Sequence, residues 1–147
     1  MEKLGRILMV EDDNNDVDMT MTALDEYNLA NEVIVARDGA EALDYLFYRG
    51  KYESRSSENP AVLLLDLKLP KVDGLEVLRQ VKSDDKLKMI PVVVLTSSHE
   101  EKDMVASYEL GVNAYVVHNV NVLRGVFASV LPCVPSRALR IVPFMYV

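Results

Sequence analysis

The sequence is poor in cysteine, in basic residues and in long hydrophobic runs. Its single cysteine, Cys133, has no partner for an internal disulfide, which indicates a reducing compartment. Acidic residues outnumber basic ones by 23 to 16, and the net charge of −7 excludes a general nucleic-acid binder, which needs a basic surface. No run reaches the ~18 apolar residues of a membrane span, and the N-terminus, with its acid at Glu2, does not resemble a signal peptide. We therefore expect a soluble, cytoplasmic protein with no membrane partner.

The composition is otherwise that of a single globular domain. The chain has 147 residues, of which 50% are hydrophobic and 27% are charged. This is enough to bury a substantial core, and it excludes disorder for most of the chain. An acidic surface suits solubility and contacts with other proteins.

One stretch organises the rest of the chain. Residues 61–65 form an unbroken apolar run, and Asp66 follows directly. A run without alternation is typical of a strand that is covered on both faces, as in a parallel sheet. In open parallel sheets, binding and catalytic residues lie at the carboxyl ends of the strands, which makes Asp66 a candidate functional residue. The alternative is that Asp66 only opens the turn toward Pro70.

Other apolar segments alternate with helical patterns along the chain. Four more strands are expected at residues 6–10, 32–36, 90–95 and 114–117. Helices are expected at residues 17–28, from Asp38 to about Gly50, from Asp73 to about Ser83, and from Ser98 to about Leu110. Short links between alternating strands and helices predict an α/β fold, a doubly wound five-stranded parallel sheet with helices on both faces.

Local signals mark the boundaries of these elements. Asp38 and Glu41 have the spacing of a capping box, and so do Ser98 and Glu101, so that Asp38 and Ser98 are expected to begin their helices. Residues 51–60 are rich in serine and charge, and we expect a polar surface loop there.

Polar side chains follow most of the expected strands. Glu11 and Asp12 follow the first strand, Asp66 the third, Thr96 the fourth and His118 the fifth. Three carboxylates brought to one edge repel one another unless a proton or cation is bound, and an all-oxygen site favours Mg²⁺. Such a site suits phosphoryl transfer with an aspartate as nucleophile, and a threonine hydroxyl can bind a phosphoryl oxygen. The alternative is that all of these are loop-forming polar residues.

At these residues the chain resembles the response-regulator receiver domains of two-component signalling. The resemblance runs from Arg6 to Val117, and its motifs are Val10-Glu11-Asp12, Leu63-Leu64-Leu65-Asp66-Leu67-Lys68-Leu69-Pro70, Asp73-Gly74, Val94-Leu95-Thr96-Ser97 and Tyr115-Val116-Val117. It implies the flavodoxin-like fold of CheY-like receivers. The run from Asp66 to Pro70, the loop at residues 48–60 and residues 82–84 are most similar to small single-domain regulators that partner phytochrome-type histidine kinases.

The resemblance also implies roles for individual residues. Asp66 would be the phospho-acceptor, Thr96 would bind the phosphoryl group, and Tyr115 would turn inward on activation. The metal ligands for Mg²⁺ would be Glu11, Asp12, Asp66 and the backbone carbonyl of Lys68. The phosphoryl donor would be a histidine kinase or phosphotransfer protein. The chain would not be an enzyme but would signal to a downstream protein by contact, without an output domain of its own. The resemblance leaves open whether the chain forms a homodimer.

The chain departs from the family pattern after its fifth strand. Receiver domains have a lysine there, usually followed by proline, where this chain has His118-Asn119. A histidine is shorter and only fractionally charged at neutral pH, so phosphorylation would persist while its coupling to output weakens. One alternative is therefore a pseudo-receiver that acts as a scaffold without phosphorylation. A second is a magnesium-dependent phosphatase with an aspartyl nucleophile, but such enzymes carry a second aspartate where this chain has Lys68.

The C-terminal part has an unusual composition. After Glu109 the only charged side chains are Arg124, Arg137 and Arg140. A helix can still form over residues 122–131, so we expect a receiver domain at residues 1–131 and an atypical apolar tail at residues 132–147. Either the tail packs on the domain or a partner, or the reading frame shifts after about Val117, which we favour. Sequencing the coding DNA and translating its other frames tests the second hypothesis.

Overall fold

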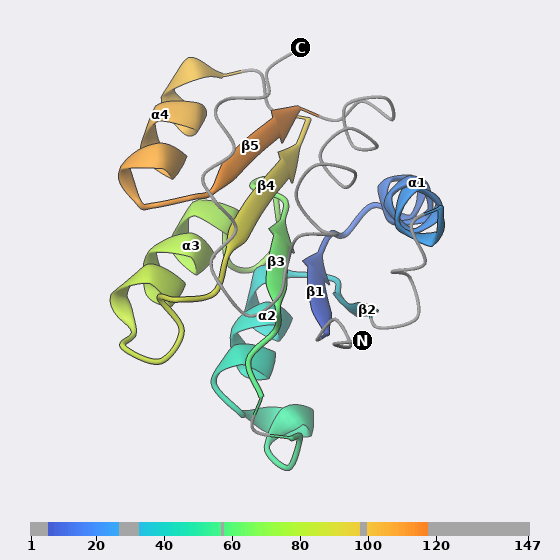
Figure 1. The fold of residues 1–147 in the computed structure, drawn as a ribbon, viewed down its shortest axis with the longest axis vertical. Coiled ribbons are helices and arrows are strands. Elements are labelled where there is room, and N and C mark those ends of the chain that lie inside the picture. Colours follow the sequence, from blue (N-terminus) through green and yellow to red (C-terminus); the bar gives the residue numbers. More distant parts are fainter. Residues whose placement is uncertain (1–5, 27–32, 57, 98–99, 118–147) are drawn as a thin grey trace.

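The computed structural model describes residues 6–26, 33–56, 58–97 and 100–117, in which strands and helices alternate (Figure 1). The strands are β1 (Ile7–Val10), β2 (Val33–Ala36), β3 (Val62–Leu65), β4 (Val92–Thr96) and β5 (Ala114–Val117). The helices are α1 (Asn14–Asp25), α2 (Gly39–Leu46), α3 (Gly74–Ser83) and α4 (Glu101–Glu109), with a short 3₁₀ turn, η2 (Gly50–Tyr52).

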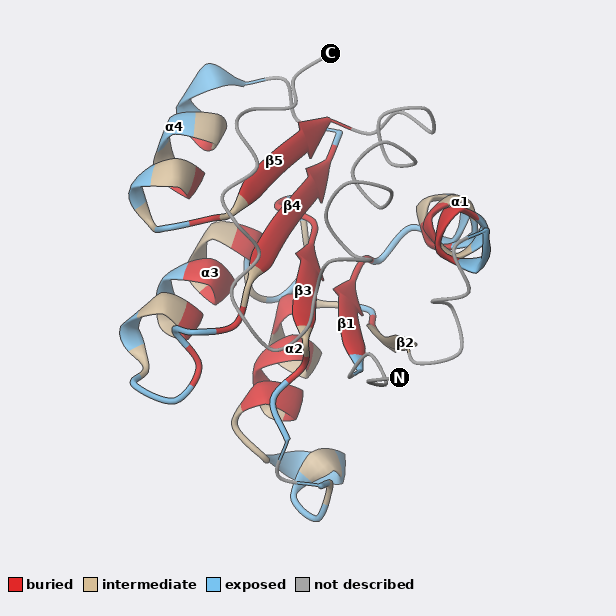
Figure 2. Cartoon of the chain, in the orientation of Figure 1, coloured by how far each residue is buried: buried red, intermediate tan, exposed pale blue. Residues whose placement is uncertain are grey.

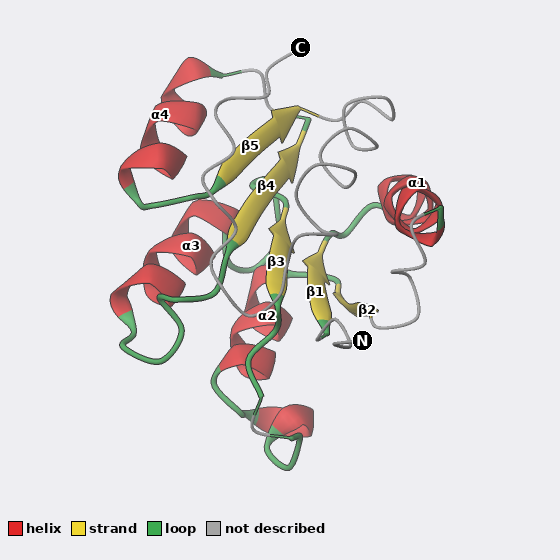
Figure 3. Cartoon of the chain, in the orientation of Figure 1, coloured by secondary structure: helices red, strands yellow, loops and turns green. Residues whose placement is uncertain are grey.

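All neighbouring strands are parallel, in the order β2-β1-β3-β4-β5 (Figure 3). The chain first extends the sheet from β1 to β2 and then continues on the other side of β1 with β3, β4 and β5. The direction of winding therefore reverses between β1 and β3. In doubly wound folds this reversal is where ligands bind, at the carboxyl ends of the two strands.

The sheet is buried on both faces (Figure 2), which explains its unbroken apolar runs. One face packs against α2, α3 and partly buried residues of α4, and its strand residues include Leu8, Val10, Leu63, Leu65, Val92 and Val94. The other packs against α1, and its strand residues include Ile7, Met9, Val62, Leu64, Val93 and Leu95. Helices thus cover both faces, as the sequence predicts.

Each expected strand is confirmed to within about two residues, but the beginnings of two helices differ from expectation. The first helix begins at Asn14 rather than residue 17, because the Asp13 carboxylate accepts a hydrogen bond from the Asp16 N–H and caps it. The capping box expected at Ser98 is wrong. Helix α4 begins at Glu101 with Glu100 at its N-cap and no side-chain cap bond; Ser98 itself lies outside the described residues.

The segment between α2 and β3 is largely the polar surface loop expected there, with a short 3₁₀ turn and one anchored arginine in addition. Helix α2 ends at Leu46 rather than near Gly50, whose φ of 57° instead begins the 3₁₀ turn η2. The Arg55 guanidinium lies 4.1 Å from the ring centroid of Tyr45 and 3.9 Å from that of Tyr48. Its Nε also donates to the Tyr45 carbonyl at 2.6 Å. Cation–π stacking and carbonyl contacts therefore hold this segment against α2.

Several expectations lie outside the described residues: His118, the helix at residues 122–131, the domain boundary after residue 131, the tail at residues 132–147 and Cys133. Among the described helices, none combines the length and the apolar character needed to cross a membrane.

Candidate functional site

The candidate site lies where β1 and β3 end side by side. Their register pairs Val10 with Leu65, so the next residues, Glu11 and Asp66, leave the sheet together. The backbone ladder continues past both strands, because the Asp66 N–H donates to the Val10 carbonyl at 3.0 Å and the Glu11 N–H to the Ala36 carbonyl at 3.0 Å. The backbone therefore holds two carboxylates at one edge of the sheet.

Asp12 completes an acidic cluster with these two residues. One carboxylate oxygen from each of Glu11, Asp12 and Asp66 lies within 4.8 Å of the others. Glu11 and Asp66 are buried, with 4% and 6% of their surface exposed, while Asp12 is exposed. Hard divalent cations prefer oxygen ligands of this kind, so the cluster fits such an ion. The three acids that the sequence predicts as metal ligands are thus brought together.

The electrostatics of Asp66 also favour a cation. Loss of solvent and the neighbouring Glu11 charge raise the pKa of Asp66 from 3.8 to about 7, although hydrogen bonds from the Lys68 N–H and the Thr96 hydroxyl oppose the rise. Desolvation, together with the charge of Glu11, also raises the pKa of Asp12. A bound cation would remove the cost of ionising these carboxyl groups together.

The neighbouring positions predicted from the sequence lie around Asp66 or on the adjoining strands. Thr96 is the last residue of β4, is wholly buried and hydrogen-bonds Asp66 through its hydroxyl. The Lys68 N–H donates to Asp66 Oδ1 at 3.3 Å, so its backbone lies beside the cluster, while the role of its carbonyl stays a prediction. Tyr115 lies on β5 with 1% of its surface exposed and belongs to the core, while its turn on activation stays a prediction. His118 lies outside the described residues.

Gly74 has a role that the sequence did not reveal. A Cβ atom on this residue would lie 2.2 Å from the Asp66 carbonyl oxygen and 2.5 Å from the Leu67 Cα. The Gly74 N–H also donates to the Leu67 carbonyl at 3.0 Å. Only glycine allows α3 to begin this close to the backbone that follows Asp66. The sequence predicts a helix start at Asp73 and gives Asp73-Gly74 as a motif of the resemblance, but no local pattern indicates the contact.

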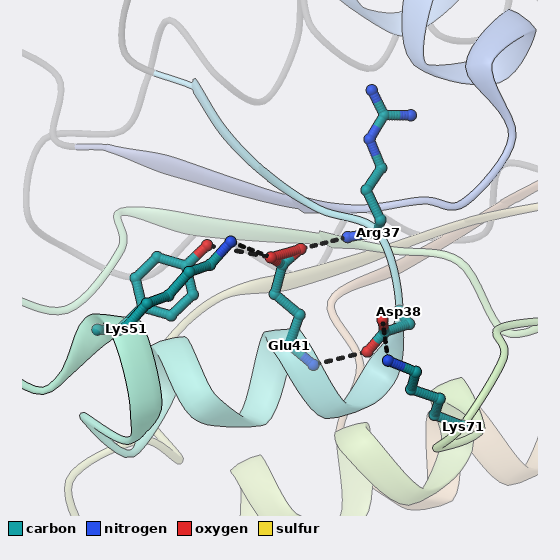
Figure 4. Close-up of polar contacts among 6 residues, drawn as sticks. Arg37, Asp38, Glu41, Lys51 and Lys71 are labelled. Atoms are coloured by element: carbon teal, nitrogen blue, oxygen red, sulfur yellow. Dashed lines mark hydrogen bonds and ion pairs between the residues drawn. The ribbon is translucent and has the colours of Figure 1, made fainter.

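A polar network ties the loop after β3 to the start of α2 (Figure 4). Asp38 caps α2 by accepting from the Glu41 N–H at 2.7 Å, as expected, and its carboxylate pairs with Lys71 Nζ at 3.4 Å. Glu41 accepts from the Arg37 N–H at 2.8 Å and pairs with Lys51 Nζ at 2.8 Å. The network joins three loops that are remote in sequence, which is why the sequence shows only the capping pair.

A doubly wound parallel sheet with an acidic cluster at its switch point is the arrangement of a receiver domain. The sequence model of the family described as "Response regulator receiver domain" matches residues 7–124, and the chain belongs to this family. It is a response regulator, a signalling protein of two-component systems.

The chain is similar to several response regulators, some of which are named for phytochromes. Rcp1 from Synechocystis sp. is 46% identical over 124 residues, which cover 84% of this chain and 82% of Rcp1. The structure of its Mn²⁺-bound form has a TM-score of 0.80 at 39% identity, covering 92% and 98% of the two chains. The bacteriophytochrome response regulator AtBRR is 57% identical, with a TM-score of 0.73 and coverage of 86% and 96%. Phosphorylated RcpA, a cyanobacterial phytochrome response regulator, is 40% identical, with a TM-score of 0.78 and coverage of 85% and 92%.

Proposed function

We propose that Asp66 accepts a phosphoryl group from a phosphohistidine of a histidine kinase or phosphotransfer protein. The observation that carries the proposal is the acidic cluster, in which carboxylate oxygens of Asp66, Glu11 and Asp12 lie within 4.8 Å of one another. The Thr96 hydroxyl beside Asp66 supplies a donor for a phosphoryl oxygen. The phosphorylated form of the similar regulator RcpA supports this reading.

The metal in this proposal is Mg²⁺, held by Glu11, Asp12, Asp66 and the backbone carbonyl of Lys68. The Mn²⁺-bound form of Rcp1 and the close approach of three carboxylates here support a divalent ion at this place. When bound, the ion neutralises negative charge on the phosphoryl oxygens, which is most of what phosphoryl transfer requires from a protein.

In the reaction, an Asp66 carboxylate oxygen attacks the phosphorus of the phosphohistidine. The new O–P bond forms as the P–N bond breaks, and the imidazole nitrogen keeps the electron pair and then takes a proton. The Thr96 hydroxyl, which donates to the free Asp66 carboxylate, then donates to a phosphoryl oxygen. Tyr115 and His118 are the further residues we assign to the response. His118 takes the place of the usual lysine.

The partners follow from the same comparisons. The names of AtBRR and RcpA connect them with phytochromes, and we infer a phytochrome-type histidine kinase as the donor for this chain. We assign the output to protein contact at α4, with the buried Tyr115 as part of the response rather than of the contact surface. We assign the receiver domain to residues 1–131, and the family match over residues 7–124 lies within this range. A cytoplasmic location is part of the proposal.

The test is intact-mass spectrometry after incubation with a small acyl-phosphate donor and Mg²⁺. The wild type should gain a single phosphoryl adduct, and Asp66→Asn should gain none. The matched control is Asp85→Asn, which removes an aspartate whose side chain is 96% exposed; it should behave as the wild type. Chelation of the metal should abolish the adduct, and replacement of Mg²⁺ by Mn²⁺ or Ca²⁺ tests the identity of the ion.

A folded wild type without an adduct would refute phosphorylation and favour the scaffold that binds partners without it. In that case His118→Lys is the next variant, because it restores the residue that receiver domains usually carry. An adduct that survives in Asp66→Asn would place the acceptor at another residue.

A further inference from the structure

Helix α4 is anchored differently from the other helices of its face. Its two buried residues are Asp103 and Ser107, whereas α3 buries the apolar side chains of Val77, Leu78 and Val81. The apolar residues of α4 that pack on the core are only partly buried. A helix with little buried apolar surface is held more weakly, so polar contacts count for more in its position.

One of these polar contacts connects α4 to the acidic cluster through a single residue, Lys68. Asp103 Oδ2 lies 3.5 Å from Lys68 Nζ, and the Asp103 side chain is 9% exposed while that of Lys68 is 56% exposed. The backbone N–H of the same lysine donates to Asp66 Oδ1 at 3.3 Å. Lys68 therefore contacts the phospho-acceptor through its backbone and α4 through its ammonium group.

We propose that the Lys68 ammonium moves from Asp103 to the phosphoryl group when Asp66 is phosphorylated, and that this exchange loosens α4. The proposal rests on the proposed function, because it needs a phosphoryl group on Asp66. It makes Asp103 a positioning residue, which acts on the site through Lys68.

Charge and reach favour the exchange. The single charge of the Asp66 carboxylate is replaced by a phosphoryl group that carries about two negative charges. The Lys68 ammonium is mostly exposed and sits on a flexible four-carbon stem, so it can move from one anion to another at little cost. Asp103 cannot follow, because it lies on the buried side of a helix. Loss of the ammonium then removes stabilisation from a buried carboxylate, and α4 must adjust.

The test is hydrogen exchange of the α4 amides, measured with and without the acyl-phosphate donor and Mg²⁺. In the wild type, phosphorylation should raise the exchange rates by about threefold or more, the effect of losing a partly buried ion pair. Lys68→Met should exchange faster before phosphorylation and should lose the response. Lys68→Arg keeps the charge and should keep the response.

Two further variants separate the exchange from general effects on the helix. Asp103→Asn should also lose the response. If that variant does not fold, Lys68→Met is the deciding variant, because the Lys68 side chain is mostly exposed and its replacement should not prevent folding. The matched control is Lys102→Met, on the same helix. The Lys102 side chain is 81% exposed, and its ammonium lies 3.2 Å from Glu100 Oε2. This variant should respond as the wild type does.

Intact mass of each sample distinguishes the two proposals. A wild type that gains no adduct refutes the proposed function and the exchange with it. An adduct that leaves α4 exchange unchanged overturns the exchange alone, and so does a full response in Lys68→Met.

Discussion

Replacing Asp66 by asparagine should stabilise the metal-free domain at neutral pH. The residue is 6% exposed, and loss of solvent with the Glu11 charge raises the pKa of its carboxyl from 3.8 to about 7. Ionisation of this group therefore opposes folding. A neutral amide of nearly the same shape avoids that cost, so the residue we assign to chemistry is one that the fold would be more stable without.

The sign and size of the effect follow from the two pKa values. The folded state holds the Asp66 proton more tightly than the unfolded chain, so it binds more protons between about pH 4 and pH 7. The free energy of unfolding of the wild type falls across this range as pH rises, by up to about 1.4 kcal/mol per pH unit. Asp66→Asn should therefore be more stable by about 2–4 kcal/mol at pH 7 and by almost nothing below about pH 3, where both states are protonated.

The assay is urea unfolding in the presence of a chelator at several pH values, followed by circular dichroism because the chain has no tryptophan. The control, Asp85→Asn, should stay within about 0.5 kcal/mol of the wild type. The reasoning is refuted if Asp66→Asn is no more stable than the wild type at pH 7, or if its gain is equally large at low pH.

Three further predictions concern the site and its supports. A hundredfold excess of Mg²⁺ over its dissociation constant should stabilise the wild type by about 2.7 kcal/mol, and Asp66→Asn by clearly less; equal shifts in Tm would contradict a site that contains Asp66. Gly74→Ala should lower the free energy of unfolding by about 3 kcal/mol, because its Cβ would meet the Asp66 carbonyl at 2.2 Å, and an unchanged urea midpoint would contradict this. Arg55→Met should cost about 1–2 kcal/mol through lost stacking on Tyr45 and Tyr48, with Arg55→Lys recovering part; thermal unfolding of both variants checks it.

Much of the fold could be predicted because its signals are local. Five short apolar runs with helical patterns between them indicated five parallel strands, and the structure pairs them in that way. The residues after β1 and β3 could be predicted to meet, since parallel strands end at the same edge of a sheet. The rule places these acids on one edge, and the strand order, with β1 beside β3, brings them into one cluster.

Helix ends and the segment after α2 were less predictable, because several weak signals compete there. Ser98 has the spacing of a capping box, yet α4 begins at Glu101. The composition of residues 51–60 indicated a polar surface loop, and most of its described residues are exposed, but it gave no sign that Arg55 stacks on Tyr45 and Tyr48. The partners of a side chain outweigh its own propensity whenever the chain brings an aromatic ring or a carbonyl within reach.

The sequence by itself therefore determined the class of fold, the five strands and the acids at their ends, since these depend on hydrophobic periodicity and on the direction of the strands. Only the tertiary structure decided which loops support the site. The contact of Gly74 with the Asp66 backbone and the Lys68–Asp103 ion pair each join residues from different elements. Such contacts depend on how the helices pack against the sheet. A local pattern of residues does not specify the distances between side chains on different elements.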